Sequence, residues 1–535
     1  MAIQQNSKRQ RIRIRFWGGI PAGDDAEAFT RRGFTVEVAE GEWLDDRELA
    51  VTDSVVMTQS AADLKGIFEP LNSFADKLLE FDCRIYIRVA TGLKMQGRER
   101  RTVANVIKQL RLPAAGLSAE ERQTWALGFQ DREANSFAPY VYLCDSGLSW
   151  DRLAQTILEN PAGFPPNLEL MPDATNRDQS PLKLPEESIT LLRRGFWDSK
   201  EVHLERMQDG LSGVDVFKAY ARAKGPLLGE GWWTSFFAKI GDRKKIISEY
   251  ENYENYALEY IPFNLVPRLN PERCGLGARL GIIVGDFVDQ AEPLRDCAWK
   301  GRSAHALGTL FTRTLIAWLH AAREQEKPLE ELLADFLPRD VKIPEARQEM
   351  IRSLGVNPDL RQISELLSQC AKQSVRVGTI HGDLNASNIL VRLSDAIIID
   401  LEKMRQTGPL LYDPASIEAS LLVDGFREDR REIKDWLRSI DSLYDTLGVF
   451  DLRTPCHPKD GSAWFFECVR TIRIHARPLE FGPGQYALFL ALALIKKSWN
   501  PEMFGDRRDE LRAAAYVLGE RILKLVVAGR DKQKP

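Results

Sequence analysis

The 535-residue chain lacks the features that build disulfide frameworks, zinc-thiolate sites and membrane spans. Its seven cysteines lie far apart and form no CxxC pair, which argues against both a disulfide framework and a zinc site. The longest apolar run, residues 486–495, is about half as long as a bilayer span requires, so it predicts a buried helix. The N-terminus has no apolar signal core, and we expect a cytoplasmic protein with reduced thiols.

The chain also lacks an excess of either charge. It has 73 Lys and Arg residues against 77 Asp and Glu residues, a net charge of −4 and a pI of about 6.0. This balance gives no strong nucleic-acid signal, and the local basic clusters are expected to be solvated surface. We find no internal repeat and no low-complexity tract. The length predicts several domains.

The first part of the chain alternates strand-like and helix-like segments. The strand patterns cover residues 11–17, 34–39, 54–57, 83–90 and 140–144. The helix patterns cover residues 67–81, 103–110 and 149–160, the last with Ser149 as N-cap. Alternation of this kind predicts a parallel sheet covered by helices. Its order resembles a flavodoxin-like domain of the receiver type, which we expect over residues 1–160.

The receiver resemblance does not extend to the phosphorylation chemistry. The third predicted strand ends in residues 57–59, where a receiver carries its phosphoacceptor Asp and this chain carries Met-Thr-Gln. Residues 17–19 and 144–145 likewise lack the receiver's acidic pair and lysine. The resemblance therefore implies a domain that docks, senses or dimerises. The segment 161–187 is rich in proline and has no apolar period, which predicts a linker.

The stretch TIHGDLNASNILVRLSDAIIIDLEK, residues 379–403, contains two apolar, β-branched segments around a turn at Ser394-Asp395. This pattern predicts a β-hairpin. Folding at that turn places Ile389 opposite Asp400, and a turn one residue longer places Asn388 opposite Asp400. Either register brings Asn388 and Asp400 together at the open end of the hairpin. Asp383 lies just upstream, on the loop that enters this end.

These three side chains suit phosphoryl transfer. An Asn carbonyl and a carboxylate, here Asn388 and Asp400, are hard ligands for Mg²⁺. A further carboxylate, Asp383, can orient an attacking hydroxyl and accept its proton. The alternative is an ordinary hairpin with polar ends. We disfavour it because Asp400 ends an apolar run, where burial of a lone carboxylate is costly.

The motif resembles the catalytic and metal-binding motifs of the aminoglycoside phosphotransferase / choline kinase family, a branch of the protein-kinase-like fold. That family has HGD, an Asn five residues after the Asp, and an apolar strand that ends in Asp. The resemblance implies that Asp383 is the catalytic Asp, that Asn388 and Asp400 hold Mg²⁺, and that His381 braces the loop. The segment 408–422 resembles the family's Asp-Pro segment before a helix, with Asp413 expected as an N-cap.

The same resemblance implies an α+β bilobal domain, with a β-rich N-lobe over residues 188–290 and a helical C-lobe over residues 291–535. The N-lobe should bind ATP through a glycine turn, a strand lysine with a helix glutamate, and a hinge. We assign these parts to Gly210, Ser212 and Gly213, to Lys239 and Glu251, and to Phe287 and Val288. Glu249 and Glu254 are the other glutamates that the helix offers.

The sequence therefore predicts a kinase that uses ATP and Mg²⁺ to phosphorylate a hydroxyl of a small molecule or protein. The acceptor is not readable, because fold does not determine it. Residues 400–406 mix charge signs, which does not favour a cationic sugar. One alternative is a non-catalytic nucleotide-binding scaffold in a multi-protein signalling or defence complex, with a protein partner or self-association through the N-terminal domain. Transfer of another nucleotide moiety is a third possibility.

Overall fold

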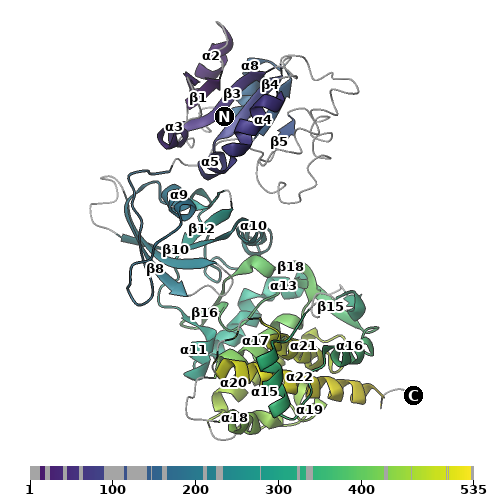
Figure 1. Cartoon of the computed structure of the whole chain (residues 1–535). Helices are drawn as coiled ribbons and strands as arrows, with labels where there is room; N and C mark the ends of the chain where they lie inside the picture. The colour runs from purple at the N-terminus through teal and green to yellow at the C-terminus, as the bar shows by residue number, and fades with distance from the viewer. Residues whose placement is uncertain are drawn as a thin grey trace. The chain divides into compact units, whose positions relative to one another are not determined.

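The computed structural model divides into two compact units (Figure 1). The first comprises Met1–Ser248 and Arg268–Phe287, and the second comprises Glu249–Pro267 and Val288–Pro535. The structure describes residues 13–17, 24–39, 45–59, 64–89, 114–116, 141–145, 148–159, 166–208, 214–223, 233–277, 279–321, 326–332, 341–426, 432–458, 461–501, 503, 505 and 507–531.

A six-stranded parallel sheet forms the N-terminal part of the first unit, with strand order β2-β1-β3-β4-β6-β5. Its strands are β1 (Arg13–Trp17), β2 (Thr35–Ala39), β3 (Thr52–Gln59), β4 (Arg84–Val89), β5 (Ala114–Gly116) and β6 (Val141–Asp145). Its helices are α2 (Asp24–Thr30), α3 (Asp46–Val51), α4 (Leu64–Ser73), α5 (Ala75–Glu80) and α8 (Trp150–Glu159). The parallel sheet predicted from the alternating pattern is confirmed.

Local signals explain most of these elements. Six consecutive residues of β3 are buried, as expected for a strand covered on both faces. The Ser149 hydroxyl accepts the backbone N–H of Arg152 (3.1 Å), which confirms the predicted cap of α8. The single helix predicted over 67–81 is instead two helices, and α4 contains Pro70, which cannot donate a helical hydrogen bond. The helix predicted at 103–110 lies outside the described residues.

A second sheet completes the first unit, with order β11-β12-β10-β9-β8-β7. Its strands are β7 (Asp173–Thr175), β8 (Ser199–Gln208), β9 (Asp215–Ala223), β10 (Trp233–Asp242), β11 (Gly275–Leu276) and β12 (Leu280–Asp286). Helix α9 (Glu186–Gly195) contributes Leu191 and Leu192 to its core. Part of the range predicted as linker 161–187 belongs here, because β7 pairs with β8 and Leu170, Ala174 and Leu184 are buried in the same core.

The second unit is mainly helical. Two small sheets, β13-β16-β17 and β14-β15-β18, hold the strands β13 (Glu292–Pro293), β14 (Glu326–Pro328), β15 (Ser374–Ile380), β16 (Ile389–Arg392), β17 (Asp395–Ile398) and β18 (Arg405–Pro409). Helix α10 (Arg243–Asn252) begins in the first unit and ends in the second. The other helices are α11 (Leu294–Trp299), α12 (Ala304–Thr309), α13 (Ile316–Ala321), α15 (Glu345–Ser353), α16 (Leu360–Ser368), α17 (Tyr412–Asp424), α18 (Ile433–Ile440), α19 (Leu447–Phe450), α20 (Ala463–Ala476), α21 (Gln485–Ser498) and α22 (Arg507–Asp531).

Helix α21 forms the centre of the helical core. Its apolar run is buried, as the sequence predicted, and it packs against α17 and α22. None of the helices in the described part of the chain has the length and apolarity to cross a membrane. Helices α17, α21 and α22 are therefore packed against one another in this core.

A buried ion pair lies in this core. Glu418 on α17 accepts two hydrogen bonds from Arg473 on α20, the shorter at 2.7 Å, and a third from the Tyr486 hydroxyl at 2.7 Å. Both charged side chains are almost completely buried. Burial acts to lower the pKa of Arg473, but the Glu418 carboxylate reverses this and raises it above its ordinary value. Each buried charge of the pair is therefore stabilised by the opposite charge of its partner.

Candidate active site

The predicted hairpin is present as β16 and β17, but its register differs from both predicted ones. Arg392 pairs with Asp395 and Ile389 with Ile398, so the turn is Leu393-Ser394. Leu393 has a left-handed backbone with φ of 59° and its side chain is 97% exposed, which ends the strand earlier than its apolar character suggests. Asn388 consequently lies opposite Ile399, whose N–H donates to the Asn388 carbonyl oxygen at 3.0 Å.

A buried carboxylate fixes the loop that begins at His381. Asp413 accepts the backbone N–H of His381 at 2.7 Å and that of Gly382 at 3.0 Å. Burial raises the pKa of Asp413, and the neighbouring His381 opposes the increase. The predicted N-cap role of Asp413 is wrong, because Leu411 precedes α17 and Asp413 lies in the first helical turn. Asp413 instead anchors the loop.

His381 braces the other side of this loop. The ring is fully buried, and its Nε2 atom lies 3.0 Å from the carbonyl oxygen of Ile399. Since a carbonyl only accepts, Nε2 carries the proton and donates it. His381 therefore connects the start of the loop to the end of β17, which is the bracing role that the sequence predicted.

Position 382 requires glycine, because its backbone is left-handed and a neighbouring carbonyl leaves no space for a side chain. Its φ is +77°, and a Cβ atom there would lie 2.4 Å from the Lys403 carbonyl oxygen. We expect Gly382→Ala to destabilise the protein and to displace the adjacent Asp383, because the clash adds to a left-handed strain of about 1–2 kcal/mol. Thermal unfolding and γ-phosphate turnover would measure the two effects.

Gly355→Ala is the matched control for this substitution. Its φ is +87° and the space around a Cβ atom is open, so it carries the same kind of backbone strain without the clash. Equal effects of the two substitutions on stability and turnover would contradict the role assigned to the close approach of Gly382 and Lys403.

The loop brings Asp383 and Asn388 together. The Asn388 side-chain amide donates to the Asp383 backbone carbonyl oxygen at 3.0 Å. Asn385 supports this arrangement, because its Oδ1 atom accepts the backbone N–H groups of Ser387 at 2.9 Å and of Asn388 at 3.1 Å. Sequence analysis missed Asn385, although an Asn within a turn commonly makes such local bonds. The hydrogen bond to Asp383 uses the side-chain amide nitrogen of Asn388. The side-chain oxygen, Oδ1, is the atom of this amide that could coordinate a cation.

Asp400 follows immediately after the residue that bonds to Asn388. Its φ of 65° and ψ of 68° are left-handed, a conformation that Asp tolerates better than most residues and that is enriched at functional sites. The residue directly precedes a 3₁₀ turn, Leu401–Lys403. Burial acts to lower the pKa of Lys403, but the carboxylate of Asp383, with smaller contributions from Glu402 and Asp400, raises it above its ordinary value. Asp400 is thus held beside the end of the hairpin that carries Asn388.

Lys403 forms an ion pair with Asp383, with 2.7 Å between its Nζ atom and Oδ2. Burial acts to raise the pKa of Asp383, but Lys403, supported by Lys496 and Lys497, outweighs it and lowers the pKa below its ordinary value. The carboxylate is therefore ionised near neutral pH. Sequence analysis did not assign a role to Lys403. Its position three residues after Asp400 was the feature of the sequence that could have placed it near the site.

A second hydrogen-bond chain supports the loop from α17 and α21. The Ala386 N–H donates to the Ser420 hydroxyl at 3.0 Å, and that hydroxyl donates to Asp424 at 3.1 Å. Lys497 completes the chain with an ion pair to Asp424 at 3.1 Å. These contacts tie the loop to two core helices, so the loop is held in place on both sides.

The predicted nucleotide contacts stay predictions, because they lie on two units or outside the described residues. Gly210, Ser212 and Gly213 lie outside the described residues. Lys239 lies on β10 of the first unit, between Val216 and Ile283 of the flanking strands. Glu251 lies on α10 in the second unit, so its pairing with Lys239 stays a prediction. Phe287 ends the last segment of the first unit, Val288 begins the next segment of the second, and both are half-buried.

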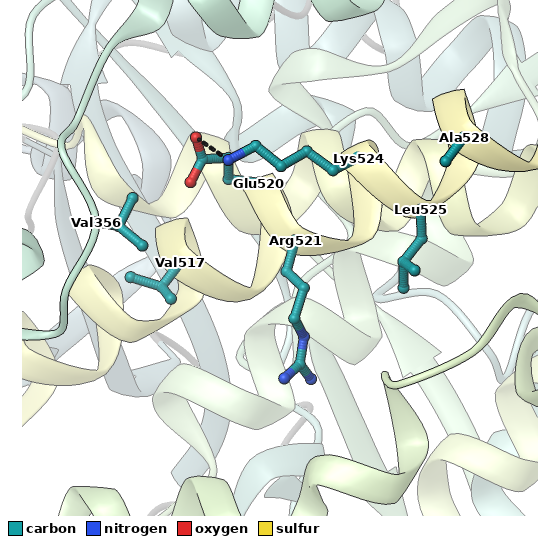
Figure 2. Close-up of a pocket in the computed structure, with 7 residues that line it drawn as sticks. All are labelled: Val356, Val517, Glu520, Arg521, Lys524, Leu525 and Ala528. Carbon is teal, nitrogen blue, oxygen red and sulfur yellow. Dashed lines mark ion pairs between the residues drawn. The ribbon is translucent and has the colours of Figure 1, made fainter.

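A separate hollow of about 470 Å³ lies along α22 (Figure 2). Two of its lining residues, Glu520 and Lys524 on the same helix, form an ion pair (3.0 Å). Its lining residues are Val356, Val517, Glu520, Arg521, Lys524, Leu525 and Ala528. None of them belongs to the loop site, and the Glu520 carboxylate is paired with Lys524.

Comparison with known proteins gives one family match and several similar solved structures. A family model described as Ternary complex associated domain 9 matches residues 351–480, which is less than half of the chain but includes the site loop. No curated protein matches the chain.

Three solved kinase structures are similar to part of this chain. An amicoumacin kinase in complex with AMP-PNP and Ca²⁺ is 13% identical over 60% of this chain and 88% of its own, with a TM-score of 0.34. A choline/ethanolamine kinase family protein from Mesorhizobium loti is 15% identical over 61% and 92%, with a TM-score of 0.32. A glucosamine kinase in complex with glucosamine, ADP and phosphate is 13% identical over 66% and 89%, with a TM-score of 0.32.

Proposed function

We propose that this protein is an ATP- and Mg²⁺-dependent phosphotransferase that transfers the γ-phosphoryl group to an alcohol. The observation that carries the proposal is the loop geometry, in which an ionised carboxylate, Asp383, is bonded through its backbone to Asn388, beside Asp400. Phosphoryl transfer needs such a carboxylate together with oxygen ligands for a divalent cation. The bracing by His381 and Asp413 keeps these groups in fixed positions.

Asn388 and Asp400 are the residues that would hold the cation. Their oxygens are hard donors, and the amide nitrogen of Asn388 is already engaged with Asp383, so the donor set fits Mg²⁺. When bound, Mg²⁺ would screen the charge of the nucleotide phosphates.

Asp383 would act on the acceptor. Its ionised carboxylate orients the acceptor hydroxyl and accepts the proton as the oxygen bonds to the γ-phosphorus. The bond between that phosphorus and the β–γ bridging oxygen breaks, and the electron pair leaves with ADP. Lys403 keeps Asp383 ionised in the free site, because its ammonium stabilises the carboxylate.

The nucleotide contacts remain part of the proposal. Gly210, Ser212 and Gly213 would cover the phosphates, and Lys239 with Glu251 would position them. Backbone groups near Phe287 and Val288 would meet the adenine. These roles follow from the family resemblance and from the strand order of the second sheet, in which β10 and β12 are adjacent.

We propose that residues 1–160 form a flavodoxin-like domain of receiver type without phosphoacceptor chemistry. The order β2-β1-β3-β4-β6 is that of a doubly wound flavodoxin-like sheet, which supports the proposal. Since the chain offers no phosphoacceptor at 57–59, this domain would bind a protein partner or a second copy of itself. Residues 188–290 and 291–535 would be the two lobes of a cytoplasmic kinase.

A second candidate function is a non-catalytic nucleotide-binding scaffold in a larger complex. The match of residues 351–480 to a domain described as associated with a ternary complex favours this candidate. Retention of Asp383, Asn388 and Asp400 favours the enzyme, because a scaffold does not need an ionised carboxylate beside a cation site.

Turnover of Mg-ATP separates the two candidates. We would incubate the full chain with γ-labelled ATP, Mg²⁺ and a panel of small-molecule alcohols and proteins, and measure nucleotide binding in parallel. Labelled product supports the kinase. Tight binding of Mg-ATP with no transfer to any acceptor and no hydrolysis would favour the scaffold.

Lys403→Met is expected to move the acid limb of the pH–rate profile to higher pH. Without the ammonium, burial raises the Asp383 pKa, so the carboxylate becomes protonated at a higher pH than in the wild type. In the wild type, the pKa of Asp383 is lower in the folded protein than in the unfolded protein. The ionised carboxylate therefore stabilises the folded protein at pH values above the unfolded-state pKa. This contribution is lost as the pH falls through the folded-state pKa. Steady-state rates across acid and neutral pH measure the shift, and an unchanged acid limb would contradict the role of Lys403.

A further inference from the structure

Three lysine side chains contribute to the positive potential at Asp383, and they differ in their partners. Lys403 pairs with Asp383 itself and Lys497 pairs with Asp424. Lys496, on α21, instead lies 2.5 Å from the hydroxyl of Tyr412. Among the described residues, no carboxylate lies within ion-pair distance of the Lys496 ammonium, although the side chain is half-buried.

Two carboxylates and two cations face Lys496, so these charges and Lys496 together have one more cation than carboxylate. They are Asp383, Lys403, Arg405 and Asp413. Asp383 is already paired with Lys403, and Asp413 is engaged by two backbone N–H groups. Burial lowers the pKa of Lys496, and the neighbouring Lys403 and Arg405 add to the decrease while Asp383 opposes it. A half-buried ammonium in such surroundings gains most from an anion that enters the site.

We propose that the acceptor is an anionic alcohol, one that carries a phosphate or carboxylate near the hydroxyl to be phosphorylated, and that Lys496 binds this group. The inference rests on the proposed function, because it places the acceptor hydroxyl at Asp383. Lys496 bonds to Tyr412, and the next residue, Asp413, binds the backbone N–H groups of His381 and Gly382 directly before Asp383, so a small acceptor can meet both Lys496 and Asp383. A cationic amino sugar or a quaternary amine would instead be repelled by Lys403, Arg405 and Lys496.

The same anion-binding chemistry could serve a different ligand, the terminal phosphate of the nucleotide. Binding of the acceptor and binding of the nucleotide phosphate by Lys496 predict different kinetics. If Lys496 binds the acceptor, its removal raises KM for anionic acceptors and leaves KM for ATP near the wild-type value. If Lys496 binds the nucleotide, its removal raises KM for ATP with every acceptor, which would overturn the proposal.

The kinetic test compares matched acceptor pairs in wild type and Lys496→Met. The pairs are glycerol with glycerol phosphate and a nucleoside with its monophosphate, and glucosamine serves as a cationic acceptor. Wild type should prefer the anionic member, and Lys496→Met should lower its kcat/KM about 10- to 100-fold, the loss expected for a charge-assisted hydrogen bond. Lys496→Arg should retain the preference. Lys372→Met, an exposed lysine after α16, is the control and should match wild type.

A second measurement does not depend on turnover. We would label the lysines of the full chain with an amine-reactive reagent and measure modification of Lys496 by mass spectrometry. Glycerol phosphate or the nucleoside monophosphate should protect Lys496, and the uncharged alcohols should not. Equal modification with and without the anions, or a wild-type preference for neutral or cationic acceptors, would overturn the inference. If no acceptor is phosphorylated, the proposed function fails, while protection of Lys496 still establishes the anion site.

Discussion

Asp383→Asn is expected to lower γ-phosphoryl transfer about 10²- to 10⁴-fold, the usual contribution of a positioned general base. An amide of the same shape cannot accept the proton of the attacking hydroxyl. The backbone carbonyl of Asp383, which accepts the amide of Asn388, is unchanged by the substitution, so the loop should keep its shape. Mg-ATP binding should therefore persist. Steady-state turnover and calorimetric titration of Mg-ATP measure the two quantities separately.

Asp441→Asn is the matched control for this substitution. Asp441 is a half-exposed carboxylate paired with Arg521 at 2.7 Å, remote in sequence from the loop. Its loss should leave turnover close to wild type, because exposed ion pairs contribute little. Turnover of Asp383→Asn comparable to that of Asp441→Asn would contradict the assignment of Asp383 as the catalytic carboxylate.

Glu418→Ala is expected to destabilise the second unit by about 3–5 kcal/mol, because it leaves the Arg473 charge buried without its partner. The hydroxyl of Tyr486 loses its acceptor as well. For a unit of this size, 1 kcal/mol corresponds to about 2–4 °C, so the unfolding transition should fall by roughly 10 °C. Scanning calorimetry measures the shift.

Two variants separate the loss of pairing from the loss of a side chain. Glu467→Ala removes an exposed glutamate on α20 and should leave the transition near that of wild type. Replacing Glu418 and Arg473 together by Met and Leu should recover most of the stability, since apolar residues often substitute for a buried pair without cost. A transition in Glu418→Ala unchanged from wild type would contradict the structural role of the pair.

The fold was predictable where periodicity is strong. The alternating strands β1 to β4 and β6, the buried helix α21 and the hairpin β16–β17 all follow from local patterns of apolar residues. The register of the hairpin was not predictable, because Leu393 is apolar but occupies an exposed, left-handed turn position. The range 161–187 was also misleading, since its prolines suggested a linker while Leu170 and Leu184 are buried in a core.

The sequence predicted only those site residues that lie on one continuous loop. Asp383, Asn388 and Asp400 belong to a single continuous motif, and the structure keeps Asp383 and Asn388 in contact. Lys496, which we propose as an anion-binding residue, lies on α21, more than a hundred residues after Asp383, and no local pattern points to it. Asp413 was assigned to a helix cap because the sequence shows its neighbours along the chain but not the N–H groups that approach it in space.

Binding of Mn²⁺ in the presence of ATP tests the central claim most directly. Electron paramagnetic resonance would compare wild type with Asn388→Ala and Asp400→Asn, with Asp441→Asn as the control. We expect the wild type and the control to bind the ion, and both loop variants to bind it at least about tenfold more weakly. Mn²⁺ bound equally well by Asn388→Ala, Asp400→Asn and wild type would contradict the claim that these two residues hold a divalent cation.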